Sequence, residues 1–133
     1  MIYLLDTHTF IWAVMENSNL SRKSSEIILD KNNDICVSTV SFWEISLKTS
    51  LNKFSFENVN IKDFPQLARE MGFTIIDMQE NETISFHELS LKKNHKDPFD
   101  RMLIWQAITR NITMISKDDL FKQYKKDGLK LIW

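Results

Sequence analysis

The chain has 133 residues, enough to bury a hydrophobic core, and we expect one domain over residues 1–133. Apolar residues make up 43% of it and charged residues 26%, with two glycines and two prolines, which excludes a disordered or collagen-like chain. The formal net charge of -1 excludes a strongly basic domain drawn to nucleic acid by its overall field, so any such contact needs a local patch.

Short apolar runs predict strands, and longer segments with apolar residues three and four positions apart predict helices between them. In chain order we expect a strand at 2–5, helices at 9–15 and 24–30, a strand at 35–37, helices at 42–51 and 61–71, a strand at 73–76, helices at 82–91 and 99–110, and strands at 113–115 and 130–132. Strands that alternate with helices favour an α/β fold with a mostly parallel sheet covered on both faces.

The segments between these elements carry local signals. Ser21 is expected to cap the helix that follows it, and Gly72 to end the helix before the third strand. The polar stretch 52–60 is expected to be a loose loop. Cys36 is the single cysteine, which excludes an internal disulfide. It lies in an apolar run and is interpreted as a small buried hydrophobe.

The amino-terminal segment gives no sign of export. It has no basic region and reaches Asp6 too early for a signal peptide. No apolar run approaches the roughly 18 residues that a membrane span requires. We therefore expect a cytoplasmic protein with no membrane contact.

Acidic residues stand at the ends of several predicted elements, where an open parallel sheet binds its ligands. Asp6 directly follows the first strand, Glu44 lies one helical turn after the second, and Asp118 follows the fourth. Each also has a structural interpretation as a helix cap: Asp6 alone, Glu44 in a capping box with Ser41, and Asp118 in a box that begins at Ser116.

The segment Asp97-Pro98-Phe99-Asp100 has the pattern of a helix start. Asp97 fits the N-cap, Pro98 the first helical position, and Asp100 the third, where the helix dipole favours negative charge. We expect Asp97 to be the cap and Asp100 to project into a site.

A shared rim would make these acids a cation site. Two ionised carboxylates about 5 Å apart repel by roughly 3 kcal/mol at an effective dielectric near 20, so a cluster of them must bind a cation or take up protons. Hard oxygen ligands suit Mg²⁺ or Mn²⁺, which favour phosphate-bearing substrates. His8, His87 and His95 have no ligand spacing and there is no second cysteine, which argues against zinc; we expect His8 and His95 near the rim.

The segment from Lys92 to Lys96 is the one clearly basic cluster, and it comes just before Asp97. It is either a solvated face or a surface that steers phosphate groups toward the acids. Both interpretations stay open.

These motifs resemble the PIN-domain ribonucleases and, more narrowly, the VapC-type toxins of bacterial and archaeal toxin–antitoxin pairs. The resemblance spans nearly the whole chain, and the Asp97-Pro98-Phe99-Asp100-Arg101 block is its most specific part. Its other segments are Leu4 to His8 with Trp12, Ser38 to Ile45 with Lys48, His95 to Leu103 with Gln106 and Ala107, and Ile115 to Asp118 with Phe121 and Tyr124.

The resemblance implies a three-layer α/β/α domain that holds one or two divalent ions, Mg²⁺ or Mn²⁺, and hydrolyses RNA phosphodiester bonds. It also implies an acidic quartet, namely Asp6, Glu44, Asp100 and Asp118. Asp97 is one further candidate ligand. Our hypothesis is that Asp6 and Asp100 bind the metal directly, while Glu44 and Asp118 act through water or hold a second ion.

Three further residues bear on the resemblance. Ser116 matches the small hydroxyl residue, threonine or serine, found at this strand end in family members. Arg101 is expected either to contact a phosphate or to pair with an acid of the site. Trp105 stands where a small residue is usual, so we expect it to change helix packing or a dimer face.

Partners also follow from the resemblance. It implies a cognate antitoxin that covers the acidic cleft, and two copies of the chain paired through apolar helical surface near the N-terminal half.

Two alternatives remain: a non-catalytic module that binds RNA or protein, and a receiver or phosphatase-like signalling domain. Loss of an acid would favour the first, and none is missing. The second normally needs an acidic pair after the first strand, where this chain has Asp6 and His8, and Asp77 is its candidate phosphoacceptor.

Overall fold

A parallel sheet forms the centre of the molecule. In the computed structural model, which describes residues 1–15 and 17–133, five strands lie in the order β3-β2-β1-β4-β5, and each neighbouring pair is parallel. The strands are β1 (Ile2–Leu5), β2 (Asp34–Ser38), β3 (Thr74–Ile76), β4 (Thr113–Ile115) and β5 (Lys130–Ile132). The predicted strands are confirmed to within one residue at each end.

Helices connect the strands. The α-helices are α1 (Thr7–Met15), α2 (Arg22–Leu29), α3 (Thr39–Ser50), α4 (Phe64–Glu70), α5 (Glu80–Ser85) and α6 (Pro98–Arg110). Short 3₁₀ helices are η1 (Asn17–Asn19), η2 (Ile61–Asp63), η3 (Phe86–Glu88) and η4 (Asp119–Asp127). The segments predicted as helices are all helical, although the one expected at 82–91 consists of α5 and η3 and ends at Glu88.

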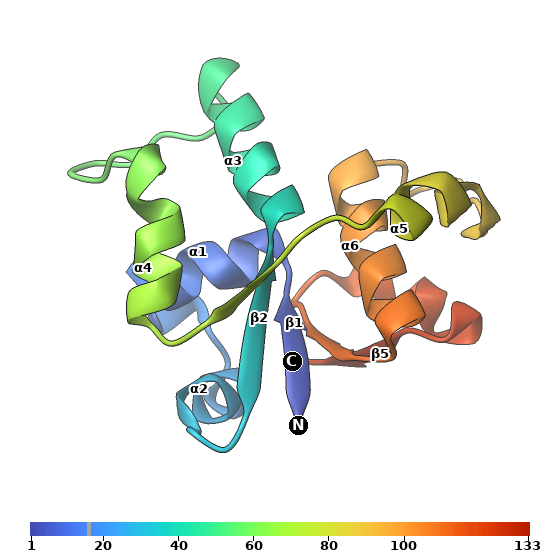
Figure 1. Ribbon diagram of the computed structural model, residues 1–133, viewed down its shortest axis with the longest axis horizontal. Helices are drawn as coiled ribbons and strands as arrows, with labels where there is room; N and C mark the ends of the chain where they lie inside the picture. The colour runs from blue at the N-terminus through green and yellow to red at the C-terminus, as the bar shows by residue number, and fades with distance from the viewer. Residues whose placement is uncertain (16) are drawn as a thin grey trace.

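The sheet has a hydrophobic core on each face, because side chains alternate along a strand. Leu5, Val37 and Ile115 pack on one face, in the core that receives side chains from α1, α2 and α4. Leu4 and Cys36 pack on the other face, beneath α6 and η4. Figure 1 shows the resulting layers, with α1, α2 and α4 on one side of the sheet and α5 and α6 on the other. The expected three-layer α/β/α fold is confirmed.

The helix starts follow local capping chemistry. The Ser21 side chain accepts a hydrogen bond from the backbone N–H of Ser24, as expected of an N-cap. The expected capping box between Ser41 and Glu44 is wrong, because α3 begins earlier and Ser38 is its cap. Ser41 lies inside α3, where its hydroxyl accepts a buried hydrogen bond from Thr7.

The stretch 52–60 is more ordered than its polar composition suggested. Asn52 and Asn58 adopt positive φ values of 58° and 59°, which asparagine tolerates in turns. Phe54, Phe56 and Val59 are half-buried against the core beneath α1 and α4. The apolar residues of the loop therefore fix it to the domain.

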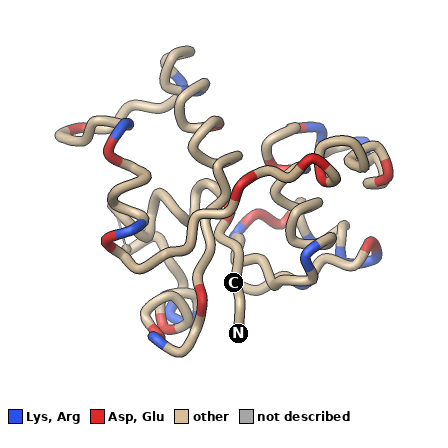
Figure 2. Tube along the Cα trace, viewed as in Figure 1, with Lys and Arg blue, Asp and Glu red and all other residues tan. Residues whose placement is uncertain are grey.

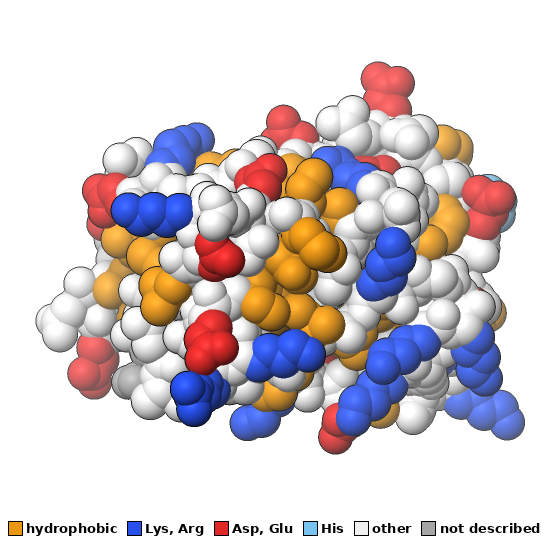
Figure 3. All heavy atoms as spheres, turned by 90° about the horizontal axis from the view of Figure 1, so that it is seen from below, with side chains coloured by type: hydrophobic (Ala, Val, Ile, Leu, Met, Phe, Trp, Pro, Cys, Tyr) orange, Lys and Arg blue, Asp and Glu red, His pale blue; other side chains and the backbone are white. Residues whose placement is uncertain are grey.

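The face at the amino ends of the strands is apolar. Met1, Ile2 and Leu29 are exposed at this end of the sheet. Figure 3 shows hydrophobic side chains gathered in the middle of this face, with basic side chains along part of its edge. Among the described residues, no helix has the length and apolar character to cross a bilayer.

The carboxyl ends of β1 and β4 lie at the point where the strand order reverses. The chain builds β2 and β3 on one side of β1 and then returns to place β4 and β5 on the other side. Ligands of open α/β sheets bind in the crevice at such a switch point. Asp6 follows β1 here and Ser116 follows β4. In Figure 2, acidic segments lie near the middle of the molecule, beyond these strand ends.

Candidate metal centre

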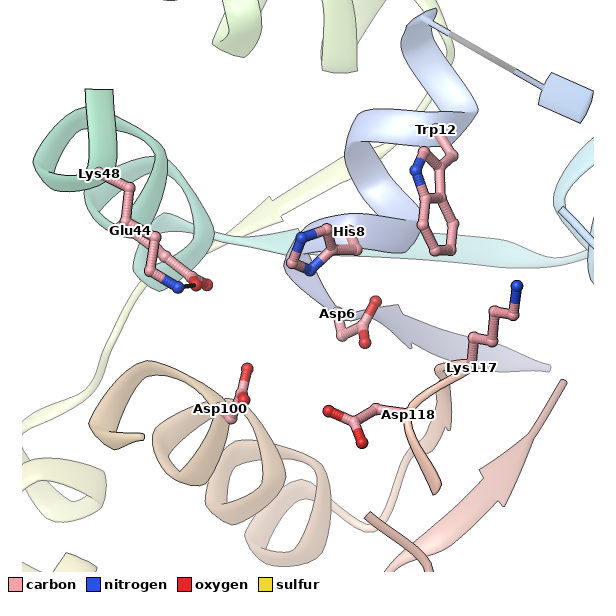
Figure 4. Close-up of a pocket in the computed structure, with 8 residues that line it drawn as sticks. All are labelled: Asp6, His8, Trp12, Glu44, Lys48, Asp100, Lys117 and Asp118. Carbon is pink, nitrogen blue, oxygen red and sulfur yellow. Dashed lines mark hydrogen bonds and ion pairs between the residues drawn. The ribbon is translucent and has the colours of Figure 1, made fainter. Parts of the chain in front are cut away.

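A pocket of about 230 Å³ opens at this edge of the sheet. Its lining residues are Asp6, His8, Trp12, Glu44, Lys48, Asp100, Lys117 and Asp118. Figure 4 shows the carboxylates of Asp6, Asp100 and Asp118 around a common space, with Glu44 and Lys48 on the far side of it. The structure therefore brings together all four acids of the predicted quartet, from the ends of β1 and β4 and from α3 and α6.

Asp6 is both a helix cap and a pocket residue. Its Oδ1 accepts a hydrogen bond of 2.9 Å from the backbone N–H of Thr9, in the first turn of α1. Its Oδ2 accepts a hydrogen bond from the hydroxyl of Ser116, whose oxygen in turn accepts one from the N–H of Asp118. Burial raises the pKa of Asp6 and outweighs the hydrogen bonds from Ser116 and Thr9, which lower it.

Asp97 and Asp100 take different positions at the start of α6. Asp97 caps α6 by accepting a hydrogen bond of 3.0 Å from the N–H of Asp100, and the Asp100 side chain lines the pocket. Burial, together with the negative charges of Asp97, Glu44, Asp6 and Asp118, raises the pKa of Asp100 to about 8. The raised pKa places a proton on Asp100 at neutral pH, which relieves the repulsion between the neighbouring carboxylates.

His95 supports Asp100 from below the pocket. Its Nε2 lies 3.2 Å from Asp100 Oδ2, and its Nδ1 lies 2.7 Å from the hydroxyl of Tyr124. Burial lowers the pKa of His95, so its ring is neutral at pH 7. We expected this residue near the rim, but it is buried with its ring against Phe121 and Tyr124.

Glu44 and Lys48 form an ion pair within the pocket, one turn apart on α3. Lys48 Nζ contacts Glu44 Oε2 and lies 3.7 Å from Asp97 Oδ2. Burial lowers the pKa of Lys48, but the hydrogen bond and charge of Glu44 outweigh it and the net shift is upward. The other oxygen, Glu44 Oε1, is buried and has no hydrogen-bond partner among the described residues. The sequence offered one signal for this pair, its i, i+4 spacing.

The donor atoms fit a divalent ion. Two sets of side chains bring ligand atoms within 4.8 Å of one another, namely His95, Asp100 and Asp118, and Glu44, Asp97 and Asp100. Most of these donors are carboxylate oxygens, the ligands that Mg²⁺ and Mn²⁺ prefer. Mutual repulsion of the carboxylates, which contributes to the raised pKa of Asp100, favours a bound cation.

Three predicted site residues do not line the pocket: Asp97 and Ser116 contact residues that do, whereas Arg101 is bound elsewhere. Its guanidinium donates to the backbone carbonyls of Leu89 and Ser90 and lies over the ring of Phe86. Across residues 1–15 and 17–133 it pairs with no carboxylate. It lines a second cavity of about 340 Å³, together with Leu91, Lys92, Lys93, His95 and Lys96. His95 therefore borders this basic cavity and also contacts Asp100 of the acidic pocket.

A family model for the PIN domain matches residues 3–127. The chain belongs to the PIN domain family. The match includes β1 to β4 and all the pocket acids of this PIN domain, whereas β5 lies beyond its end. None of the curated proteins matches the sequence of the chain.

Solved structures similar to this PIN domain include three from VapBC assemblies. VapBC2 from Rickettsia felis, bound to a DNA fragment from its promoter, has a chain with 21% identity and a TM-score of 0.69, over 99% of this chain and 98% of that one. DNA-bound VapBC from Salmonella typhimurium has a chain with 15% identity and a TM-score of 0.66, and the match covers 99% of this chain and 97% of that one. VapBC-1 from nontypeable Haemophilus influenzae has a chain with 20% identity and a TM-score of 0.66, and the match covers 99% of this chain and 97% of that one. At these identities the similarity establishes the fold.

Proposed function

We propose that this PIN domain is a metal-dependent endoribonuclease and the toxin of a toxin–antitoxin pair. The observation that carries the proposal is the convergence of Asp6, Glu44, Asp100 and Asp118 on one pocket of a PIN fold. These residues are distant in sequence and come from four separate elements. A cluster of carboxylates that already holds a proton has a strong electrostatic reason to bind a divalent cation.

Asp6 and Asp100 are the proposed direct ligands of Mg²⁺ or Mn²⁺, with Asp118 and Glu44 beside them, acting through water or holding a second ion. A divalent ion bound there lowers the pKa of a bound water and offsets the negative charge of a phosphodiester. The hydroxyl of Ser116 fixes the orientation of the Asp6 carboxylate, and neutral His95 does the same for Asp100.

The proposed partners are RNA as substrate and an antitoxin as inhibitor. The exposed side chains of Trp43, Leu47 and Leu51 form an apolar stripe along α3, the helix that also carries Glu44 and Lys48. An antitoxin segment that packs on this stripe reaches the pocket and can offer a basic side chain to its carboxylates. A second copy of the chain is the further proposed partner, through exposed apolar side chains of the N-terminal half such as Leu29.

RNA cleavage by single-residue variants tests the proposal. Asp6→Asn and Asp100→Asn should each reduce the cleavage rate by at least about 100-fold, because each removes a ligand charge, and EDTA should abolish cleavage by the wild type. Asp77→Asn is the matched control, since Asp77 is exposed after β3 and does not line the pocket. It should cleave at the wild-type rate, and circular dichroism should show all three variants folded.

Full activity in both pocket variants, or cleavage that resists EDTA, refutes the proposal. RNA binding without cleavage identifies the non-catalytic module.

A further inference from the structure

We propose that the ammonium group of Lys48 takes the place of a second metal ion, so that this nuclease works with a single divalent ion. A bound ion would be held by Asp6, Asp100 and Asp118 on the other side of the pocket. The inference rests on the proposed function and deepens it, because it states how many ions the site uses.

The ammonium stands within the second candidate metal set. Glu44, Asp97 and Asp100 bring one carboxylate oxygen each within 4.8 Å of the others. Lys48 Nζ contacts Glu44 Oε2 and lies 3.7 Å from Asp97 Oδ2, so it touches two of the three members. The other set, His95, Asp100 and Asp118, has no lysine contact among the ion pairs of the described residues.

The fold holds Lys48 in this position. The chain turns back after α3, since the backbone N–H groups of Lys53 and Phe54 both donate to the carbonyl of Lys48. The turn places the centroid of the Phe54 ring 5.5 Å from Lys48 Nζ, as in a cation–π contact. The Lys48 side chain is 22% exposed. The ammonium is therefore enclosed between an aromatic ring and two carboxylates.

The other lysine of the pocket differs. Lys117 lies over the ring of Trp12, with Nζ 5.9 Å from the ring centroid, and is exposed. Its ammonium pairs with no carboxylate in the described part of the chain. Figure 4 shows Lys117 on the opposite side of the pocket from Lys48. Lys117 is therefore a suitable control for a general effect of positive charge.

An ammonium and a divalent ion exclude each other from the same carboxylates. Charges of +1 and +2 within contact distance of the same carboxylates repel each other strongly. Lys48 is already held there by its own helix, so a second ion has to displace it. The ammonium supplies positive charge and N–H donors to a phosphate, while water activation is left to the single ion.

Metal stoichiometry tests the inference without reference to activity. Mn²⁺ is titrated into the wild type, Lys48→Met and Lys117→Met at about pH 8 by isothermal calorimetry, and the loaded proteins are examined by electron paramagnetic resonance. We expect one ion in the wild type and in Lys117→Met. We expect two in Lys48→Met, with the spectrum of a coupled Mn²⁺ pair. Lys48→Arg keeps the charge and should bind one ion, and Lys48→Gln is a second neutral variant should Lys48→Met unfold.

The outcomes separate this inference from the proposed function. Two ions in the wild type, or one ion in both neutral Lys48 variants, overturns the role of Lys48 and leaves the nuclease proposal intact. A wild type that binds no Mn²⁺, with cleavage unaffected by EDTA, overturns both. Two ions in Lys117→Met as well would show that any lost charge admits an ion, which also overturns the specific role of Lys48.

Discussion

Asp100 is the residue on which the electrostatics of the pocket converge. Its carboxyl group is largely buried, lies beside His95, and feels the charges of the other pocket acids. A proton and a divalent ion therefore compete for it. Metal binding should release a proton at neutral pH, because the ligand must lose it first.

The pH dependence of stability reports this proton. The ordinary pKa of an aspartate, 3.8, holds for Asp100 in the unfolded chain, whereas its pKa in the folded metal-free protein is about 8. Between these values Asp100 keeps in the folded protein a proton that it has lost in the unfolded chain. The contribution of Asp100 to the free energy of unfolding should then fall by up to about 1.4 kcal/mol per pH unit as pH rises. Melting temperatures in EDTA from about pH 5 to about pH 8 measure this slope.

Two controls accompany this measurement. Asp100→Asn has no proton to exchange and should lose most of the slope. Excess Mg²⁺ should reverse the trend in the wild type, since the ion binds better as the carboxyl deprotonates. An equal slope in the wild type and in Asp100→Asn would assign the proton to another group.

The sequence predicted the division between Asp97 and Asp100 because capping depends on neighbours a few positions away. It did not predict the burial of His95, whose partner Tyr124 is 29 positions distant in the chain. The capping box assigned to Glu44 was wrong for a similar reason. The contact of Ser41 with Thr7, 34 positions away, belongs to the packing of α3 on α1.

Among the elements, α5 and α6 are joined by a buried ion pair. Glu82 is 1% exposed, and its carboxylate accepts hydrogen bonds from Arg110 at 2.6 Å and 2.9 Å. Gln106 donates to the same carboxylate at 3.2 Å, and the indole N–H of Trp105 bonds to Ser85 of α5. The unusual Trp105 thus takes part in the packing of the two helices.

Breaking this ion pair should destabilise the domain without affecting the metal site. Arg110→Met leaves the charge of Glu82 buried and unpaired, which should lower the free energy of unfolding by about 3 kcal/mol in urea titrations. Arg22→Met is the control, because the Arg22–Glu26 pair on α2 is exposed. Equal stability of the two variants would show that the buried pair contributes nothing. Mn²⁺ affinity should stay at the wild-type value in both.

The elements were predictable to the extent that their apolar spacing is regular. All strands lie where the apolar runs placed them: β1, β2 and β4 are largely buried, and the edge strands β3 and β5 keep half-buried apolar residues. η4 was not predicted, because only Phe121 and Tyr124 of its residues are buried and their spacing is too short a pattern. The expected helix at 82–91 continues past Ser85 as a 3₁₀ turn, after which Leu89 is buried under α6.

On the scale of the whole molecule, the charges are balanced but not evenly placed. The acidic pocket lies on one side of His95, and the cavity lined by Lys92, Lys93, Lys96 and Arg101 lies on the other. Lys92 is already paired with Asp127, whereas Lys93 and Lys96 are exposed. With a net charge of -1, RNA binding has to rely on such a local patch.

Removal of the two exposed lysines should weaken RNA binding. In an Asp6→Asn background, which prevents cleavage, Lys93→Met/Lys96→Met should reduce the dependence of log Kd on log salt by about one for each phosphate that the protein no longer neutralises. Lys31→Met is the control, as Lys31 is exposed in the turn before β2, at the opposite end of the sheet. A salt dependence unchanged by the double substitution would show that this segment is only a solvated face.

The hydrogen bond from Ser116 to Asp6 joins positions 110 apart and ties together the carboxyl ends of the neighbouring strands β1 and β4 beside the acidic pocket. A ribosome that has not yet reached β4 has supplied neither Ser116 nor Asp118, so a nascent polypeptide cannot assemble the complete carboxylate set. Under the proposed function, a toxin built this way stays harmless throughout most of its own translation.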